Sequence, residues 1–343
     1  MNGTSNTHTD TLNPSEKSFV LTGHSAEVFA CDFSSSGMLQ VFVLLNLILG
    51  DVAASAGFDR TVMLWNITEG FNNNLVMRGH TNAILQVKFA PRDPSKILTA
   101  SADKSVAWWD TIEGDRVKKL TGHTSIVNCC AMSKQGVPLG FSGGDDGTIK
   151  LWDMRDKKCG GTMEHSYQIL SLDTSPDGNR IYAGTIDDSV LVCDVRNMES
   201  PVEVISSPEG YMDSVCGVAV SGDGDSLISL SMNGTAHLWD VRPFCESGDR
   251  LLYTYHKIVS NFEMNLLRIH WSPDDMLFSV GSSDQSVNVH KVRPDINDMD
   301  TLVCKLPGHE GTVHESVFHP KERYAVLNAS SDKNLSYLAG IAS

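Results

Sequence analysis

The sequence is short of basic residues. It holds 27 Lys and Arg against 42 Asp and Glu, which gives a formal net charge of −15 over 343 residues. Proteins that bind a nucleic-acid backbone over a broad face depend on Lys and Arg, because these residues release condensed counterions. We therefore expect no broad contact with RNA or DNA, and we expect basic protein surfaces to be the better complement.

Long apolar runs, paired cysteines and catalytic signatures are missing as well. The longest apolar run, 38–49, has 12 residues, whereas a membrane-spanning helix needs about 20. The 8 cysteines include no CxxC pair, and segment 1–17 has neither a basic start nor an apolar stretch. These absences predict reduced thiols, no secretory signal and no membrane span. Walker A, GxSxG and HExxH motifs are also lacking, so we expect no enzymatic activity, no cofactor and no metal ion.

What the sequence does contain is an internal repeat. His80 precedes Trp109 by 29 residues, and His123 precedes Trp152 by the same 29. Gly-His occurs at 23–24, 79–80, 122–123 and 308–309, and Trp-Asp or Trp-Asn at 65–66, 109–110, 152–153 and 239–240. This pattern is typical of WD40 repeats, each of which forms one four-stranded blade of a β-propeller. Weaker copies begin near His165, Tyr211, Asn261 and His309, which makes seven repeats.

The repeats predict one all-β domain, a seven-bladed WD40 propeller over 18–343, preceded by a flexible polar tail, 1–17. Residues 18–22 should form the outer strand of the last blade. Pairing of the two chain ends closes the ring and removes open sheet edges.

Each of the first three repeats carries the same four side-chain types at corresponding positions. A buried Trp can donate its indole N–H to a Ser or Thr hydroxyl, which can reach a His, which can reach a turn Asp. Such a closed network pairs every buried polar group and specifies strand register. The complete sets are His24, Ser55, Asp59 and Trp65; His80, Thr99, Asp103 and Trp109; and His123, Ser142, Asp146 and Trp152. Later repeats break the set: Ala183, Val280 and Asn328 replace the hydroxyl, and the fifth repeat keeps only Ser229 and Trp239. We expect the first three blades to be the better specified ones.

The first repeat is longer than the others. Asp59 follows His24 by 35 residues, whereas this step takes 23 residues in the second, third and seventh repeats. The 12 extra residues coincide with the apolar run 38–49, an unusual composition for a solvent-facing turn. Three interpretations stay open: a longer hairpin that packs on a partner, a local insertion against the side of the blade, or an in-frame intron retained in the gene prediction.

A further motif occurs in repeats three to five. The tripeptides 153–155, 194–196 and 240–242 all read Asp, any residue, Arg, and each follows a Trp or a Cys. They resemble the WDxR boxes of propellers that act as substrate receptors of cullin ubiquitin ligases, where the Arg is the docking contact. The same Asp and Arg also commonly pair with each other at the end of a strand. Arg155, Arg196 and Arg242 are therefore candidate partner contacts, and a cullin-ligase receptor is the alternative function.

Segments outside the repeat signature resemble one family, the WD-repeat subunits of the U5 small nuclear ribonucleoprotein in the pre-mRNA splicing machinery. The similar segments are 55–60, 114–125, 143–155, 239–244, 261–268, 271–274, 305–309 and 329–333. The resemblance runs in order from about Leu21 to Leu338, and it departs at the insertion, at Cys193, at Tyr211 and at 337–341. It implies a non-enzymatic nuclear scaffold that is a monomer within a larger complex. Its implied partners are the large U5 scaffold protein and other spliceosomal proteins, with RNA met only indirectly.

Overall fold

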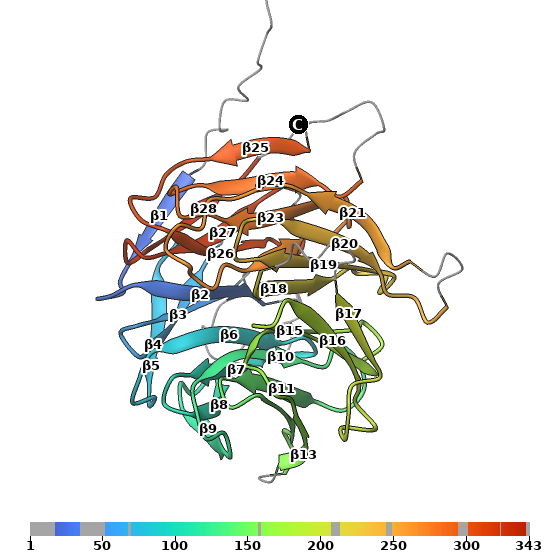
Figure 1. The fold of residues 1–343 in the computed structure, drawn as a ribbon. Helices are drawn as coiled ribbons and strands as arrows, with labels where there is room; N and C mark the ends of the chain where they lie inside the picture. Colours follow the sequence, from blue (N-terminus) through green and yellow to red (C-terminus); the bar gives the residue numbers. More distant parts are fainter. Residues whose placement is uncertain are drawn as a thin grey trace, which may run out of the picture.

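A computed structural model describes residues 18–34, 52–67, 70–156, 159–206, 213–244, 249–293, 301–322 and 324–340. These residues form seven antiparallel sheets of four strands each, arranged in a ring (Figure 1). Blades one to three consist of β2 (Val28–Phe33), β3 (Val52–Gly57), β4 (Thr61–Asn66) and β5 (Asn73–Arg78); β6 (Ile84–Ala90), β7 (Asp93–Ser101), β8 (Ser105–Asp110) and β9 (Arg116–Thr121); and β10 (Val127–Met132), β11 (Leu139–Gly144), β12 (Thr148–Asp153) and β13 (Cys159–Glu164). Blades four and five consist of β14 (Ile169–Thr174), β15 (Arg180–Thr185), β16 (Ser189–Asp194) and β17 (Glu203–Ser206); and β18 (Val215–Val220), β19 (Ser226–Ser231), β20 (Ala236–Asp240) and β21 (Leu251–Tyr255). Blades six and seven consist of β22 (Ile269–Trp271), β23 (Leu277–Gly281), β24 (Val287–Lys291) and β25 (Leu302–Leu306); and β26 (Val313–Phe318), β27 (Val326–Ser330), β28 (Asn334–Leu338) and β1 (Ser18–Thr22). The predicted seven-bladed all-β propeller is confirmed.

The two ends of the described chain meet in blade seven. β1 pairs with β28 from Ser18 opposite Leu338 to Thr22 opposite Asn334, and Figure 1 shows the blue strand β1 beside the red strand β28. Leu21 of β1 is buried against blades one and seven. The predicted closure by residues 18–22 is therefore confirmed, and β1 covers the edge that β28 would otherwise leave open.

The hydrophobic core is a set of layers between neighbouring blades. Each pair of adjacent blades shares one cluster of buried apolar side chains. Trp109 of blade two, for example, packs among Ala54, Val62 and Met77 of blade one. Because both faces of every sheet are covered, many strands are apolar along their whole length, as in Val215–Val220.

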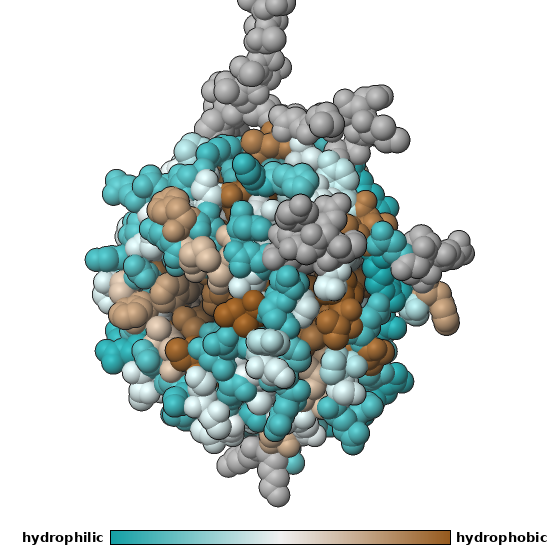
Figure 2. Space-filling model, in the orientation of Figure 1, coloured by the Kyte–Doolittle hydropathy of each residue, from teal (hydrophilic) through white to brown (hydrophobic). Residues whose placement is uncertain are grey.

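Antiparallel strands place the connections on two opposite rims of the ring. We call the rim that carries the connections into each inner strand the GH rim, because it holds His24, His80, His123 and His309. It also holds the turns between the second and third strands of each blade. The opposite rim, which carries the connections that leave the inner strand and the third strand, is the WD rim. Figure 2 shows apolar residues exposed around the middle of the face in view, inside a mainly hydrophilic border.

Some sequence predictions fall outside the described residues: the tail 1–17, the insertion 38–49 and Tyr211. Within the part of the chain that the structure does describe, no helix has the length and apolar character needed to cross a membrane.

Candidate interaction sites and the polar networks that position them

Blade one contains a line of hydrogen bonds between its strands. Trp65 Nε1 donates to Ser55 Oγ over 2.8 Å, and Ser55 donates to His24 Nε2 over 2.7 Å. His24 Nδ1 donates to Asp59 Oδ2 over 2.8 Å. This direction follows from the carboxylate, which can only accept: Nδ1 must be the donor, and Nε2 of the neutral ring is then the acceptor. All four side chains of the predicted set are in contact.

Blades two and three repeat this arrangement. The corresponding bonds measure 2.8–2.9 Å in the set His80, Thr99, Asp103 and Trp109, and 2.7–2.9 Å in the set His123, Ser142, Asp146 and Trp152. The Asp also accepts from backbone N–H groups of both neighbouring loops, for example from Ser25 and Thr61 in blade one. Burial acts to raise the pKa of Asp59, but the hydrogen bonds from His24 and Thr61 outweigh it and lower the pKa to about 2. Each Asp therefore ties the loop that precedes the inner strand to the turn between the second and third strands.

Blade seven builds a similar network with a different hydroxyl. Asn328 stands at the position of the missing hydroxyl, as the sequence indicated, and its cross-strand partner is Ser336. His309 Nε2 lies 2.8 Å from Ser336 Oγ, and Asn328 Nδ2 donates to the same oxygen over 3.0 Å. His309 Nδ1 donates to Asp332 over 2.8 Å. The sequence analysis missed Ser336, because it searched for the hydroxyl on the second strand and found it absent there.

Blades four to six have only parts of the network. In blade five, Trp239 Nε1 donates to Ser229 over 2.8 Å. In blade four, Asp187 accepts from Thr185 and Ser189, and His165 contacts Tyr167. In blade six, the ring at the Trp position is His290, which stacks on Phe278 with centroids 5.3 Å apart. Within the described part of these blades no His bonds to the turn Asp. In blade six the turn is linked to the inner loop by another bond, from the backbone N–H of Ser260 to Ser282 Oγ over 3.1 Å.

The three WDxR boxes adopt one common geometry on the WD rim. In each box, Nη2 of the Arg lies 2.5–2.6 Å from a carboxylate oxygen of its own Asp, and the Arg backbone N–H donates to that Asp over 2.9–3.0 Å. The side chains of Arg155, Arg196 and Arg242 are nevertheless 64%, 77% and 56% exposed. The local pairing therefore accounts for the motif itself, while one face of each guanidinium stays open to a partner.

The channel in the middle of the ring is crossed by a buried cation. Arg268 precedes β22, is 5% exposed and donates to three backbone carbonyls. Nη1 lies 2.7 Å from the oxygen of Leu170 and 3.1 Å from that of Cys216, and Nη2 lies 2.8 Å from that of Asn128. One side chain of blade six thus joins blades three, four and five.

A second charged group fills the channel from blade seven. Glu315 is fully buried; it accepts from the backbone N–H of Cys31 over 3.0 Å, from Lys88 Nζ over 3.2 Å and from His270 Nε2 over 2.8 Å. Burial acts to raise the pKa of Glu315, but Lys88 and His270 outweigh it and hold the pKa well below its usual range. Glu315 keeps its charge and links blades one, two, six and seven.

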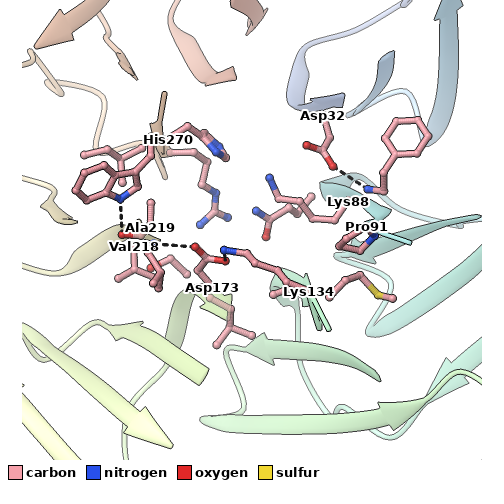
Figure 3. A pocket seen from close by; sticks show the side chains of 18 of the residues that line it. Asp32, Lys88, Pro91, Lys134, Asp173, Val218, Ala219 and His270 are labelled. Carbon is pink, nitrogen blue, oxygen red and sulfur yellow. Dashed lines mark hydrogen bonds and ion pairs between the residues drawn. The ribbon is translucent and has the colours of Figure 1, made fainter. Parts of the chain in front are cut away.

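The WD-rim end of this channel opens into a cavity of about 380 Å³ (Figure 3). Its charged side chains are engaged with neighbours: Asp32 accepts from the backbone N–H of Phe89 over 2.7 Å, and Lys134 lies 3.5 Å from Asp173. Trp271 Nε1 donates to the carbonyl of Ala219 over 2.8 Å. Among the described residues, no group of three or more His, Cys, Asp or Glu could hold a metal ion.

The sequence analysis did not identify Lys88, Arg268 and Glu315 as a set. Each is a charged residue in or next to the inner strand of a blade, and a charge buried there must find a partner inside the protein. The sequence therefore indicates that each of these residues needs a buried partner. It does not indicate which blades the charges join, because that depends on the geometry of the closed ring and not on the spacing of the repeats.

Comparison with known proteins agrees with the fold. The WD40 family profile, described as "WD domain, G-beta repeat", matches residues 15–66, 72–110, 114–153, 157–194 and 202–240. The matches stop before blades six and seven, where the signature residues are replaced. The structure shows that these two segments are blades all the same.

Full-length relatives are similar over most of the chain. The U5 small nuclear ribonucleoprotein 40 kDa protein of Dictyostelium discoideum is 34% identical over 94% of this chain and 83% of its own length. The human U5 small nuclear ribonucleoprotein 40 kDa protein is 38% identical over 92% of this chain and 82% of its own length. The pre-mRNA-splicing factor cwf17 of Schizosaccharomyces pombe is 33% identical over 91% of this chain and 84% of its own length. The resemblance seen in the sequence is thereby confirmed, and the chain belongs to the WD40-repeat family and, within it, to the family of the U5 small nuclear ribonucleoprotein 40 kDa proteins.

Proposed function

We propose that this chain is a non-enzymatic scaffold subunit of the U5 small nuclear ribonucleoprotein, acting in pre-mRNA splicing in the nucleus. The observation that carries the proposal is the similarity to U5 and splicing proteins, which extends over more than nine-tenths of the chain. A closed ring with interlocked blades offers two rims and a side to several partners at once. The partners we propose are the large U5 scaffold protein and other spliceosomal proteins, with this chain as one copy in the complex.

The charge of the chain supports attachment through proteins. A net charge of −15 disfavours direct contact with the RNA backbone and favours basic protein surfaces. RNA would then be reached only through the partners. We propose Arg155, Arg196 and Arg242 as contacts on the WD rim, because their guanidinium groups are held in place by Asp and still exposed.

We propose a structural role for the three complete His–hydroxyl–Asp–Trp sets. Apart from the partly exposed turn Asp, their residues are buried, and each set joins a loop of the GH rim to the second and third strands of one blade. They would keep the loops of the GH rim in fixed positions, which pre-organises any partner surface built from those loops.

Affinity purification of the tagged chain from nuclear extract tests the function. We expect U5 RNA and the large U5 scaffold protein to be recovered together in stoichiometric amounts. The matched variant carries Arg155→Ala, Arg196→Ala and Arg242→Ala, and it should fold normally while recovering less of at least one U5 protein. Recovery of a cullin adaptor in place of U5 components would contradict the proposal.

A further inference from the structure

The connection into blade six, residues 256–268, is the longest one on the GH rim, and it holds two large apolar side chains in solvent. Phe262 is 72% exposed and Met264 is 57% exposed. Isolated apolar residues on a surface are common, but two neighbouring ones on a structured loop are characteristic of protein contacts.

The loop is held in one conformation by its own side chains. Asn261 Nδ2 donates to the carbonyl of Asn265 over 3.0 Å, and the backbone N–H of Asn265 donates to Asn261 Oδ1 over 2.9 Å. Met264 has a φ of 55°, a left-handed conformation that is unfavourable for a residue with a side chain. The clamp by Asn261 therefore maintains a backbone that presents Phe262 and Met264 outward. An apolar anchor that is already ordered loses little conformational freedom on binding.

A series of contacts links this loop to blades seven and one. Glu263 accepts a hydrogen bond from the hydroxyl of Thr312, and Arg268 N donates to the carbonyl of His314 over 2.9 Å. The ring of His314 lies 5.1 Å from the ring of Phe29, which lies 6.5 Å from that of Phe58. Phe58 is 58% exposed. We call Phe29, Phe58, Phe262, Met264 and His314 the anchor surface.

One buried atom of the anchor surface lacks a partner. His314 is 5% exposed, and its Nε2 has no hydrogen-bond partner within the described part of the chain. Burial lowers the pKa of His314 to about 4, so the ring is neutral near pH 7. The neutral ring therefore supports Phe29 from beneath and adds no charge to the surface.

Charge restricts what can bind there. Glu27, Glu263 and Glu310 are exposed in the loops of blades one, six and seven. Every blade contributes at least one carboxylate to the GH rim, whereas the exposed Lys and Arg residues in its described loops are Arg60, Lys104, Lys257 and Lys333. An acidic segment, a nucleic-acid backbone or a second copy of this rim would meet repulsion.

We propose that the anchor surface binds a short segment of a partner protein in which Lys or Arg residues stand next to large apolar ones. The apolar side chains would pack on Phe58, Phe262 and Met264, and the basic ones would pair with Glu27 and Glu263. This inference deepens the proposed scaffold function, on which it rests, by assigning one rim and one class of partner segment.

Fluorescence anisotropy with labelled model peptides tests the inference on the purified full chain. The probe is an eight-residue peptide of alternating Leu and Lys, and the controls replace Lys by Glu or Leu by Ser. We expect the Leu-Lys peptide to bind at least ten times more tightly than either control. The double variant Phe262→Ser, Met264→Ser should bind it at least ten times more weakly than the wild type. Phe58→Ser, on blade one, should weaken it independently, and Glu263→Gln should weaken it less while reducing the salt dependence.

A matched control is Phe244→Ser, which removes an aromatic side chain that is 88% exposed on the WD rim. It should bind the peptide like the wild type, and all variants should melt like the wild type. Equal binding by wild type and double variant, or no binding of the Leu-Lys peptide, would overturn the inference.

The two proposals fail in different ways. If U5 RNA co-purifies with the wild type but the peptide result is negative, the scaffold function stands and the anchor surface does not. If no U5 RNA co-purifies, the scaffold function is contradicted whatever the peptide shows.

Discussion

In blades one to three, a buried hydroxyl joins the Trp and the His of the same blade, in addition to bonds between blades such as that from Cys130 N to Gln86. In blades four to six this internal network is incomplete, and polar bonds to neighbouring blades stand without it. Arg180 of blade four donates to the carbonyl of Val241, at the end of blade five, over 3.2 Å. Tyr255 of blade five donates to the carbonyl of Val292, and Trp271 of blade six donates to that of Ala219. Arg268 adds three such bonds.

The difference shows that the strand register of a blade can be fixed by a network inside the blade or by bonds to neighbouring blades. An internal network specifies how the second and third strands pair, because the hydroxyl must lie between Trp and His. Where that network is incomplete, bonds to neighbouring blades restrain the strand ends without it. The first kind leaves a repeat signature in the sequence, and the second kind does not.

Opening the ring should destabilise both groups of blades and have the largest effect. Deletion of residues 1–22 removes β1, exposes the edge of β28 and takes Leu21 out of the core between blades one and seven. We expect the deleted protein to aggregate, whereas deletion of 1–15 should leave soluble, folded protein. Size-exclusion chromatography and circular dichroism check both, and equal solubility of the two deletions would contradict the role of β1.

Removing the link between blades should give the next largest effect. Arg268→Met leaves three buried carbonyls without their donor, and each unpaired buried group costs about 1–3 kcal/mol. We expect the free energy of unfolding to fall by roughly 3 kcal/mol or more. Arg268→Lys should recover part of this loss, because a single ammonium can reach some of the carbonyls. Urea unfolding measures the stability of both variants. If Arg268→Met were as stable as the wild type, bonds between blades would not be what stabilises blades four to six.

Corresponding His substitutions should separate the two groups of blades directly. His80→Ala leaves the hydroxyl of Thr99 and the carboxylate of Asp103 without their central partner. We expect a loss on the order of 2 kcal/mol or more. His165→Ala, in blade four, should change stability by less than about 0.5 kcal/mol, because His165 has no such network. Differential scanning calorimetry of both variants gives the contrast, and an unchanged melting temperature for His80→Ala would contradict the network.

Blade seven offers an intermediate case. Ser336→Ala removes the oxygen that both His309 and Asn328 contact. We expect a loss of about 1.5 kcal/mol. The double variant with Asn328→Ser restores a hydroxyl on the second strand, as in blades one to three, and should recover part of the stability. No recovery in the double variant would mean that the position of the hydroxyl is not interchangeable between the strands.

The smallest effect concerns pH. Burial lowers the pKa of His237 in blade five to about 4. The unfolded chain therefore takes up a proton near the ordinary His pKa of about 6.5, while the folded chain does so only near pH 4, and stability falls as the pH drops through this window. Asp59, which is part of a hydrogen-bond network, changes the pH dependence of stability only at lower pH, between its ordinary pKa and about 2. His237→Gln should flatten the stability profile between pH 7 and pH 5 by on the order of 1 kcal/mol. An unchanged slope would contradict the assignment.

Much of the fold could be predicted because each blade repeats local information. The predicted outer strand 18–22 agrees with β1 residue for residue, and the seven predicted repeats agree with the seven sheets.

The candidate site was predicted less completely. The contacts of His24, His80 and His123 could be predicted because their partners lie at fixed separations in the sequence, and antiparallel pairing of the strands brings residues at those separations together. Ser336 was missed because the same function moved to the facing strand, and Arg268 was missed because its partners lie 52 to 140 residues away along the chain. The boxes at Arg155, Arg196 and Arg242 left two interpretations open, and the structure shows the local pairing in all three.

The sequence by itself determined the number of blades, the closure of the ring and the acidic charge that sets this chain apart from RNA-binding surfaces. These properties depend on composition and on residues at fixed separations, which repeat from blade to blade. Only the tertiary structure decided which charges meet in the channel and which apolar residues share the GH rim. Those contacts join residues of different blades, and their distances are set by the closed ring, not by separation along the chain.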